Sequence, residues 1–222
     1  MSASASNNSS GASDDAIWDR CFALGSEGET LNQRGDVPGA IAKYNEILEQ
    51  STQMTDASRR RQLNGMVLGS LGSAYSSLGQ YDKAIEHHNQ ALAISREIGD
   101  RQGEGNRLGN LGNAYKNLGQ YDKAIEHYNQ ALAISREIGD RRGEGNHLGT
   151  LGIAYHNLGQ YDKAIEHFNK ALAISREVGD RQGEGSDLGN LGSTYLNALD
   201  DPASALPHLI NSVAVYDDIW NG

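Results

Sequence analysis

The chain has 222 residues, of which 37% are hydrophobic, and it carries a formal net charge of −10 and one cysteine. It is long enough to bury a core, and without an apolar run of about 18 residues its composition is that of a soluble protein and not of a membrane-spanning one. The acidic residues are concentrated near both ends, so we expect no nucleic-acid or membrane partner, since both require a basic face.

The N-terminal segment, residues 1–15, has the sequence MSASASNNSSGASDD. It has neither a basic start nor an apolar stretch, so it is predicted to be a disordered tail and not a signal peptide. Cys21 is the single cysteine and can form no intramolecular disulfide. We therefore expect a cytoplasmic protein.

Beyond the tail, the chain is built from units that recur every 40 residues. The marker is a Leu-Gly pair, which occurs at Leu71-Gly72, Leu111-Gly112, Leu151-Gly152 and Leu191-Gly192, with a degenerate first copy at Gly28. A fixed period of this length indicates a repeat architecture. We predict one array over residues 16–222, with five units at about 16–50, 56–98, 100–138, 140–178 and 180–219.

Each unit has the pattern of two helices. In the third unit, apolar residues at helical spacing run up to Leu118 and a second stripe starts at Tyr121. Gly119 and Gly139 are placed to end the two helices, and Asp140 is placed to cap the next one. No segment has a strand pattern, so the predicted fold class is an all-α solenoid of about five helical hairpins.

The run LGNAYKNLGQYDKAIEHYNQAL, which begins at Leu111, resembles the tetratricopeptide repeat. The positions that carry the resemblance are Leu111, Gly112, Tyr115, Gly119, Tyr121, Ala124, Tyr128 and Ala131, and the same set recurs from Leu71 and Leu151. The resemblance implies a right-handed α-α superhelix in which the first helix of each hairpin forms a concave wall. The last unit departs from the pattern, with an extra residue and with Pro207 in its second helix.

The 40-residue period and the Leu-Gly-Asn motif are similar to the subfamily of the LGN/Pins adaptors. In those adaptors the array binds extended peptides. The resemblance therefore implies a protein or peptide partner, bound in extended or helical form.

The glycines of GEGNRLGNLGNAY, from Gly103, do not have the spacing of a phosphate-binding loop, and Glu104 would repel a phosphate. We therefore expect no cofactor. Gly112 resembles the family glycine that lets the two helices of a hairpin touch. For Gly109 and its equivalents two interpretations stay open: they open the groove to a ligand, or they are tolerated copies of one ancestral unit.

The family geometry places a polar, nearly uncharged set of residues on the concave wall. These predicted groove residues are Asn106, Gly109, Asn110, Asn113, Lys116, Asn117, Asn146, Gly149, Thr150, His156, Asn157, Asn190 and Asn197. Asparagine amides offer donors and an acceptor, which suits binding of a peptide backbone whatever its side chains. The alternative is an unused, solvated face.

Basic residues form a possible rim at Arg101, Arg107, Arg141 and Arg181. The LGN/Pins pattern places an arginine directly after Gly-Glu-Gly, where it pairs with acidic peptide residues. Here Asn106, Asn146 and Ser186 hold that place, so selectivity for acidic peptides is not predicted. The alternative for Arg101, Arg141 and Arg181 is pairing with acidic residues between repeats.

No catalytic or metal site is predicted. His87, His127 and His167 hold one repeat position, and equivalent residues of stacked helices lie roughly 8–10 Å apart, too far to share a metal ion. The predicted function is a non-catalytic scaffold or adaptor that binds a partner peptide in the concave groove. Two alternatives remain: a regulatory subunit of a larger assembly, or a self-associating scaffold that uses apolar residues of the last helix, namely Val213, Val215, Tyr216, Ile219 and Trp220.

Overall fold

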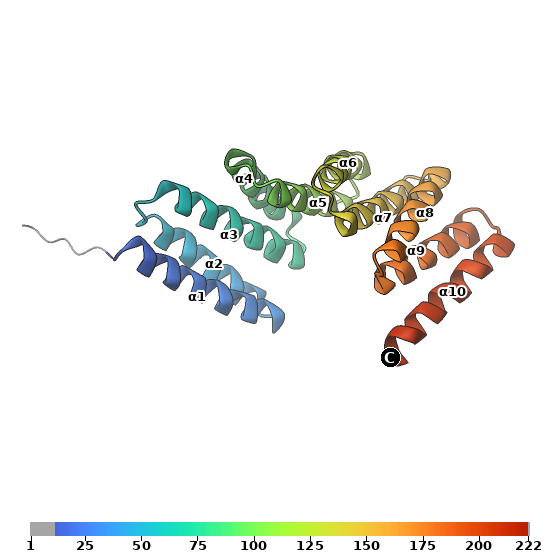
Figure 1. Ribbon diagram of the computed structural model, residues 1–222, viewed down its shortest axis with the longest axis horizontal. Coiled ribbons are helices and arrows are strands. Elements are labelled where there is room, and N and C mark those ends of the chain that lie inside the picture. Colours follow the sequence, from blue (N-terminus) through green and yellow to red (C-terminus); the bar gives the residue numbers. More distant parts are fainter. Residues whose placement is uncertain (1–11, 222) are drawn as a thin grey trace, which may run out of the picture.

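The computed structural model describes residues 12–221 as a curved array of antiparallel helical hairpins (Figure 1). The helices are α1 (Asp14–Gln33), α2 (Val37–Ser51), α3 (Ala57–Ser77), α4 (Tyr81–Ile98), α5 (Arg101–Asn117), α6 (Tyr121–Ile138), α7 (Arg141–Asn157), α8 (Tyr161–Glu177), α9 (Arg181–Ser193) and α10 (Pro202–Asn221). A short π-helical segment, η1 (Thr194–Ala198), follows α9. The expected all-α solenoid of five hairpins is confirmed, and no strand occurs among the described residues.

The array starts two residues earlier than expected. Residues 1–11 of the expected tail lie outside the described residues, but α1 begins at Asp14, after Ser13 as its N-cap. The Asp14 carboxylate accepts the backbone N–H groups of Thr55 and Asp56 at 2.8 and 2.6 Å, which joins the start of α1 to the start of α3. This long-range contact explains why the helix extends into the polar segment.

The helix ends follow from local chemistry. Asp140 accepts the backbone N–H of Gly143 at 2.9 Å, as an N-cap aspartate does, which confirms its predicted role. Gly119 and Gly139 both have φ of 72°, in the left-handed region where a side chain is disfavoured. The helices therefore end at the glycines that the sequence indicated.

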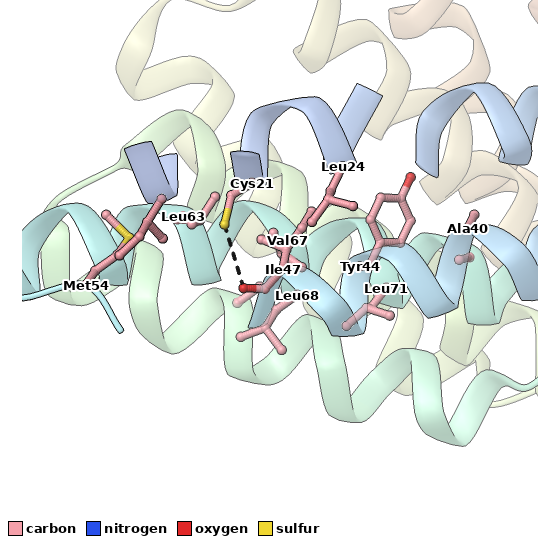
Figure 2. Close-up of a cluster of buried hydrophobic side chains, with 13 residues drawn as sticks. Cys21, Leu24, Ala40, Tyr44, Ile47, Met54, Leu63, Val67, Leu68 and Leu71 are labelled. Atoms are coloured by element: carbon pink, nitrogen blue, oxygen red, sulfur yellow. Dashed lines mark hydrogen bonds between the residues drawn. The ribbon is translucent and has the colours of Figure 1, made fainter. Parts of the chain in front are cut away.

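The two helices of a hairpin touch at the glycine of the Leu-Gly pair. A Cβ atom on Gly112 would lie 2.5 Å from Cε1 of the buried Tyr128, so only glycine allows this approach. Its packing role is thus confirmed. The degenerate first unit makes the same contact, because a Cβ on Gly28 would lie 2.8 Å from Cε1 of Tyr44. Figure 2 shows Tyr44 in the core that joins α1, α2 and α3.

The extra residue of the last unit is absorbed by η1. There the N–H of Asp201 donates to the carbonyl of Tyr195, six residues earlier, at 2.8 Å. In the third unit the equivalent hydrogen bond, from Gln120 to Tyr115, joins residues that are five apart. A single π turn inside an α-helix is the usual way to accommodate an insertion of one residue. The ring of His208 stacks on that of Tyr195, with centroids 5.6 Å apart. The equivalent histidine and tyrosine stack in the second and third units, so α10 packs in the same register as their second helices.

Candidate functional site

Polar residues of α5 and α7 surround a hollow of about 370 Å³. Its lining residues are Asn106, Arg107, Gly109, Asn110, Asn113, Tyr128, Asn146, His147 and Thr150. A second hollow of about 370 Å³ lies between α7 and α9, lined by Gly145, Asn146, Gly149, Thr150, Ile153, Ser175, Asp180, Gln182, Gly183, Ser186, Asp187 and Asn190. Because Asn146 and Thr150 line both, we treat the two hollows as one polar groove.

The structure brings eight of the predicted groove residues into this polar groove: Asn106, Gly109, Asn110, Asn113, Asn146, Gly149, Thr150 and Asn190. The other five, Lys116, Asn117, His156, Asn157 and Asn197, line neither hollow. They lie at the C-terminal ends of the first helices or in η1. Asn157 donates to its own helix at the carbonyl of Ile153, 2.9 Å away.

One groove amide is held in a defined orientation. The Tyr128 hydroxyl donates to Oδ1 of Asn113 at 2.7 Å, and burial raises the pKa of Tyr128. The amide NH₂ of Asn113 takes no part in this contact, and the residue as a whole is exposed. Such an amide is suited to donate to a peptide carbonyl.

The glycines one turn before the Leu-Gly pairs have a packing role that sequence analysis did not identify. A Cβ on Gly109 would lie 2.9 Å from Cε1 of His147 in the next first helix, and a Cβ on Gly69 would overlap the guanidinium of Arg107. The backbone of Gly109 still lines the polar groove. The glycines therefore make room for a side chain of the following repeat.

The side chains that fill this room form a row of three ionisable residues along the groove floor. Burial lowers the pKa of Arg107 and of His147 and raises the pKa of Asp187 to about 7. Nε of Arg107 is buried, and the guanidinium has no ion-pair partner among the described residues. The sequence shows these three residues at one repeat position, but only the packing shows that Asp187 is buried and that Arg107 and His147 are half-buried.

Three of the four arginines predicted as a rim, Arg101, Arg141 and Arg181, are bound to carboxylates, which favours the alternative of structural pairing, whereas Arg107 has no such partner among the described residues. Arg101 pairs with Glu104 of its own helix and with Glu137 of α6, so its partners belong to the same hairpin and not to a neighbouring repeat as expected. The link between repeats is made instead by Arg96 of α4, whose Nε lies 2.8 Å from Oε1 of Glu104. Arg141 and Arg181 repeat the arrangement, Arg141 with Glu144 and Glu177 and Arg181 with Glu184 and Asp218.

A third hollow, of about 400 Å³, was missed because the predicted groove residues all lie in the third and later units. It lies between α1 and α3 and is lined by Cys21, Phe22, Gly25, Ser26, Glu29, Tyr44, Ile47, Leu63, Met66, Val67 and Ser70. Phe22 and Met66 are 69% and 55% exposed. Both hold the repeat position of Asn106, three residues before a groove glycine, so extending the alignment to Gly25 would have found this apolar hollow.

The apolar hollow and the polar groove are joined by a fourth, of about 800 Å³, beside α3 and α4. Met66 lines both this hollow and the apolar one, and Arg107 lines both this hollow and the polar groove. The hollows therefore adjoin one another in a row along the first helices, with an apolar hollow at the N-terminal end and polar ones toward the C-terminal end. We call this the groove.

The repeated histidines pack within their own hairpins. His87 and His127 stack on Tyr75 and Tyr115, with ring centroids 5.2 Å apart in both cases. Among residues 12–221, no group of three or more His, Cys, Asp or Glu side chains is placed to hold a metal ion. In the same part of the chain, no helix combines the length and the apolarity needed to cross a membrane.

Comparison with known proteins identifies the family of this chain. The profile of the tetratricopeptide repeat matches residues 62–137 and 143–218, and the chain belongs to this family. Residues of this chain are 34% identical over 84 residues to G-protein-signaling modulator 1 of Mus musculus. The alignment covers 38% of this chain and 12% of that protein, so the expected likeness to LGN-type repeats is confirmed as distant and partial.

Solved structures share the fold. BtubC (BKLC) from P. vanneervenii superimposes with a TM-score of 0.80 at 21% identity, over 95% of this chain and 89% of that one. A Rap protein solved in complex with Competence and Sporulation Factor superimposes with a TM-score of 0.69 at 19% identity, over 89% of this chain and 55% of that one. At these identities the likeness shows the fold alone.

Proposed function

We propose that this chain is a non-catalytic adaptor that binds an extended segment of a partner protein along the groove. The single observation that carries the proposal is the row of adjoining hollows along the first helices, in which each hollow shares a lining residue with the next. Tetratricopeptide domains are in general protein-interaction modules, and the Rap structure with its bound factor supports a ligand on this fold. The single, buried cysteine supports a cytoplasmic location.

The chemistry of the groove matches an extended peptide better than a rigid small molecule. Asn110, Asn146 and Asn190 present amides from three successive first helices, and amides can pair with backbone N–H and C=O groups of any sequence. Phe22 and Met66 offer apolar contact at the other end. The partner segment is therefore expected to have an apolar side chain over α1 and α3 and to be bound mainly through its backbone further along.

A displayed library of random peptides, selected on the immobilised protein, tests this function. Affinities of the selected peptides are then measured by calorimetry for the wild type and for the double variant Asn110→Ala, Asn146→Ala. Loss of about two hydrogen bonds predicts a roughly tenfold or larger increase in Kd, with helix content unchanged.

The matched control is Asn117→Ala, Asn197→Ala, which removes two exposed amides outside the hollows. It should bind as the wild type does. If the control and the groove variant lose affinity equally, or if neither does, the peptide is not held in the groove.

Self-association is a second candidate, favoured by one face of α10. Val215 is buried against α8 and α9, and the Tyr216 hydroxyl lies 3.0 Å from Oγ of Ser186, so these two residues cap the array. Leu206, Ile210 and Val213, in contrast, are 58%, 58% and 60% exposed. Light scattering across a concentration series tests this candidate: growth in mass that Ile210→Glu, Val213→Glu abolishes would support it, and a constant monomer mass would reject it.

A further inference from the structure

The hollow between α7 and α9 contains a buried carboxylate without a cationic partner. Asp187 is only 6% exposed, and its Oδ2 accepts the Ser175 hydroxyl of α8 at 3.0 Å. No described residue donates a hydrogen bond to Oδ1, and no arginine, lysine or histidine lies within ion-pair distance of the carboxylate. A carboxylate removed from water is normally paired, because burial of an isolated charge is costly.

The open side of this carboxylate faces α7. Oδ1 would lie 3.2 Å from a Cβ on Gly149, so the absent side chain there leaves the gap between the two helices free. The gap is part of the hollow of about 370 Å³, so there is room for a side chain of a ligand beside Oδ1.

The charges that face the hollow are all negative. Its lining contains Asp187 and Asp180 and no lysine, arginine or histidine. The arginines that lie nearest in sequence are engaged elsewhere, Arg176 with Glu184 and Arg181 with Glu184 and Asp218.

The equivalent floor positions in the preceding repeats hold Arg107 and His147, so the acidic floor is particular to this end of the groove. The remaining lining groups include the side chains of Asn146, Thr150, Ser186 and Asn190, which contain oxygen atoms able to accept further N–H donors. A buried carboxylate surrounded by neutral acceptors is suited to an ammonium or guanidinium group.

We propose that this hollow binds a lysine or arginine side chain of the partner segment, with Asp187 as its counter-ion. The inference rests on the proposed function, since it assigns one side chain of the peptide that the groove holds. It also orients the peptide: the basic residue lies over α7 and α9, and the apolar residue lies over α1 and α3. Because the Asp187 carboxylate is buried, salt should weaken the binding of this basic side chain less than it weakens an ion pair on the surface.

The charge of Asp187 makes binding of a basic side chain dependent on pH. Burial raises the pKa of Asp187 to about 7, and the nearby Asp180 contributes in the same direction while the Ser175 hydroxyl opposes it. A bound cation favours the ionised carboxylate, so affinity for a basic peptide should rise as the pH rises from about 6 to about 8. In the Asp187→Asn variant this rise should be absent.

The experiment is a double-substitution cycle on the selected library peptides. The variants are Asp187→Asn, which retains the shape of the side chain, and Asp187→His, which copies the residue at the equivalent position of α7. Each is tested with a selected peptide and with the same peptide carrying methionine in place of its basic residue. The control Asp122→Asn removes one exposed carboxylate of α6 that lines none of the hollows.

We expect the selected peptides to share a basic residue at one position, and its replacement to weaken wild-type binding by about tenfold or more. The same replacement should have little effect in either Asp187 variant, while Asp122→Asn behaves as the wild type. Selected peptides without a shared basic residue, or an equal effect of the replacement in all proteins, would overturn the inference. The proposed function would stand in that case if Asn110→Ala, Asn146→Ala still raises Kd by about tenfold or more. If no groove variant changes affinity, both the inference and the proposed function fail.

Discussion

Two glycines of α1 show how much the consequence of one methyl group depends on its neighbours. A Cβ on Gly28 would lie 2.8 Å from the ring of Tyr44, whereas a Cβ on Gly25, one turn earlier, would lie 3.8 Å from Cδ1 of Ile47, an ordinary contact. Both positions are helical, so both would gain helix propensity from alanine. Only at Gly28 does the added atom have no room.

We therefore expect opposite effects of the same substitution at these two sites. Gly25→Ala should stabilise the protein by up to about 1 kcal/mol, through helix propensity. Gly28→Ala should destabilise it by about 1–3 kcal/mol, because Tyr44 is forced to move. Urea unfolding of the two variants, followed by circular dichroism, measures the difference, and equal shifts would contradict the packing role of Gly28.

Asp187 gives a second prediction at the residue scale, on stability and not on binding. Its pKa in the folded protein, about 7, lies above the value of about 4 in an unfolded chain. Below about pH 4 both states are protonated, and as the pH rises toward 7 the unfolded state ionises first, so the carboxyl group progressively destabilises the fold.

Asp187→Asn should therefore gain stability relative to the wild type as the pH is raised from about 4 to about 7. The gain has an upper limit of about 4 kcal/mol, at about 1.4 kcal/mol per pKa unit, and water in the hollow reduces it. The free energy of unfolding is measured in urea across this pH range for both proteins. A difference that does not change with pH would show that the carboxyl group is not buried as described.

At the scale of the elements, successive hairpins are joined by a repeated ion-pair network. Burial tends to raise the pKa of Glu144, but hydrogen bonds from Arg136 of α6 and Arg141 of α7 outweigh it and lower the pKa. A lowered pKa contributes stability above the unfolded value of about 4.5, and this contribution is lost as the pH falls through the folded value. The glutamate of Gly-Glu-Gly therefore connects neighbouring hairpins.

Glu144→Gln should lower the free energy of unfolding at neutral pH by on the order of 1 kcal/mol, the usual range for a hydrogen bond to a charged group near the surface. The loss should shrink as the pH is lowered, because the wild-type carboxylate is then protonated too. Glu166→Gln is the control, since Glu166 pairs with Lys170 on the exposed surface of α8 and should change stability little. Equal losses for both variants would contradict a special role for the network.

At the scale of the whole molecule, the groove differs in character between its two ends. The apolar hollow of α1 and α3 exposes Phe22 and Met66, which contribute little to the core and which the proposed partner segment would cover. The polar groove has Asn106, Asn146 and Ser186 at the equivalent positions. This gradient is a property of the array and not of any single repeat.

Phe22→Ser combined with Met66→Ser should weaken binding of the selected peptides by about tenfold or more, because a partner side chain loses apolar contact. The thermal midpoint should change little, since both side chains are largely exposed. The matched control is Leu206→Ser, an exposed apolar residue of α10 outside the groove. Unchanged affinity in the double variant, measured by calorimetry, would exclude the apolar hollow from the binding site.

The fold could be predicted from the sequence alone, because the 40-residue period repeats the apolar stripes, the helix-ending glycines such as Gly119 and the capping aspartates such as Asp140. These are local signals, and their repetition makes them unambiguous. Asn110 and Asn146, which were predicted as groove residues near the middle of the first helices, line the hollows, whereas Asn117 and Asn157 at the helix ends do not. Whether any of them contacts a peptide stays a prediction.

Only the tertiary structure decided which side chains fill the space between repeats. Arg107 and Asp187 hold one position in the sequence pattern, and their burial depends on the glycine that the preceding first helix presents to them. The partners of Arg101 were likewise decided by the distance between the two helices of its hairpin. Burial and ion pairing depend on contacts between residues far apart in the chain, and a periodic pattern specifies the repeat but not the packing between repeats.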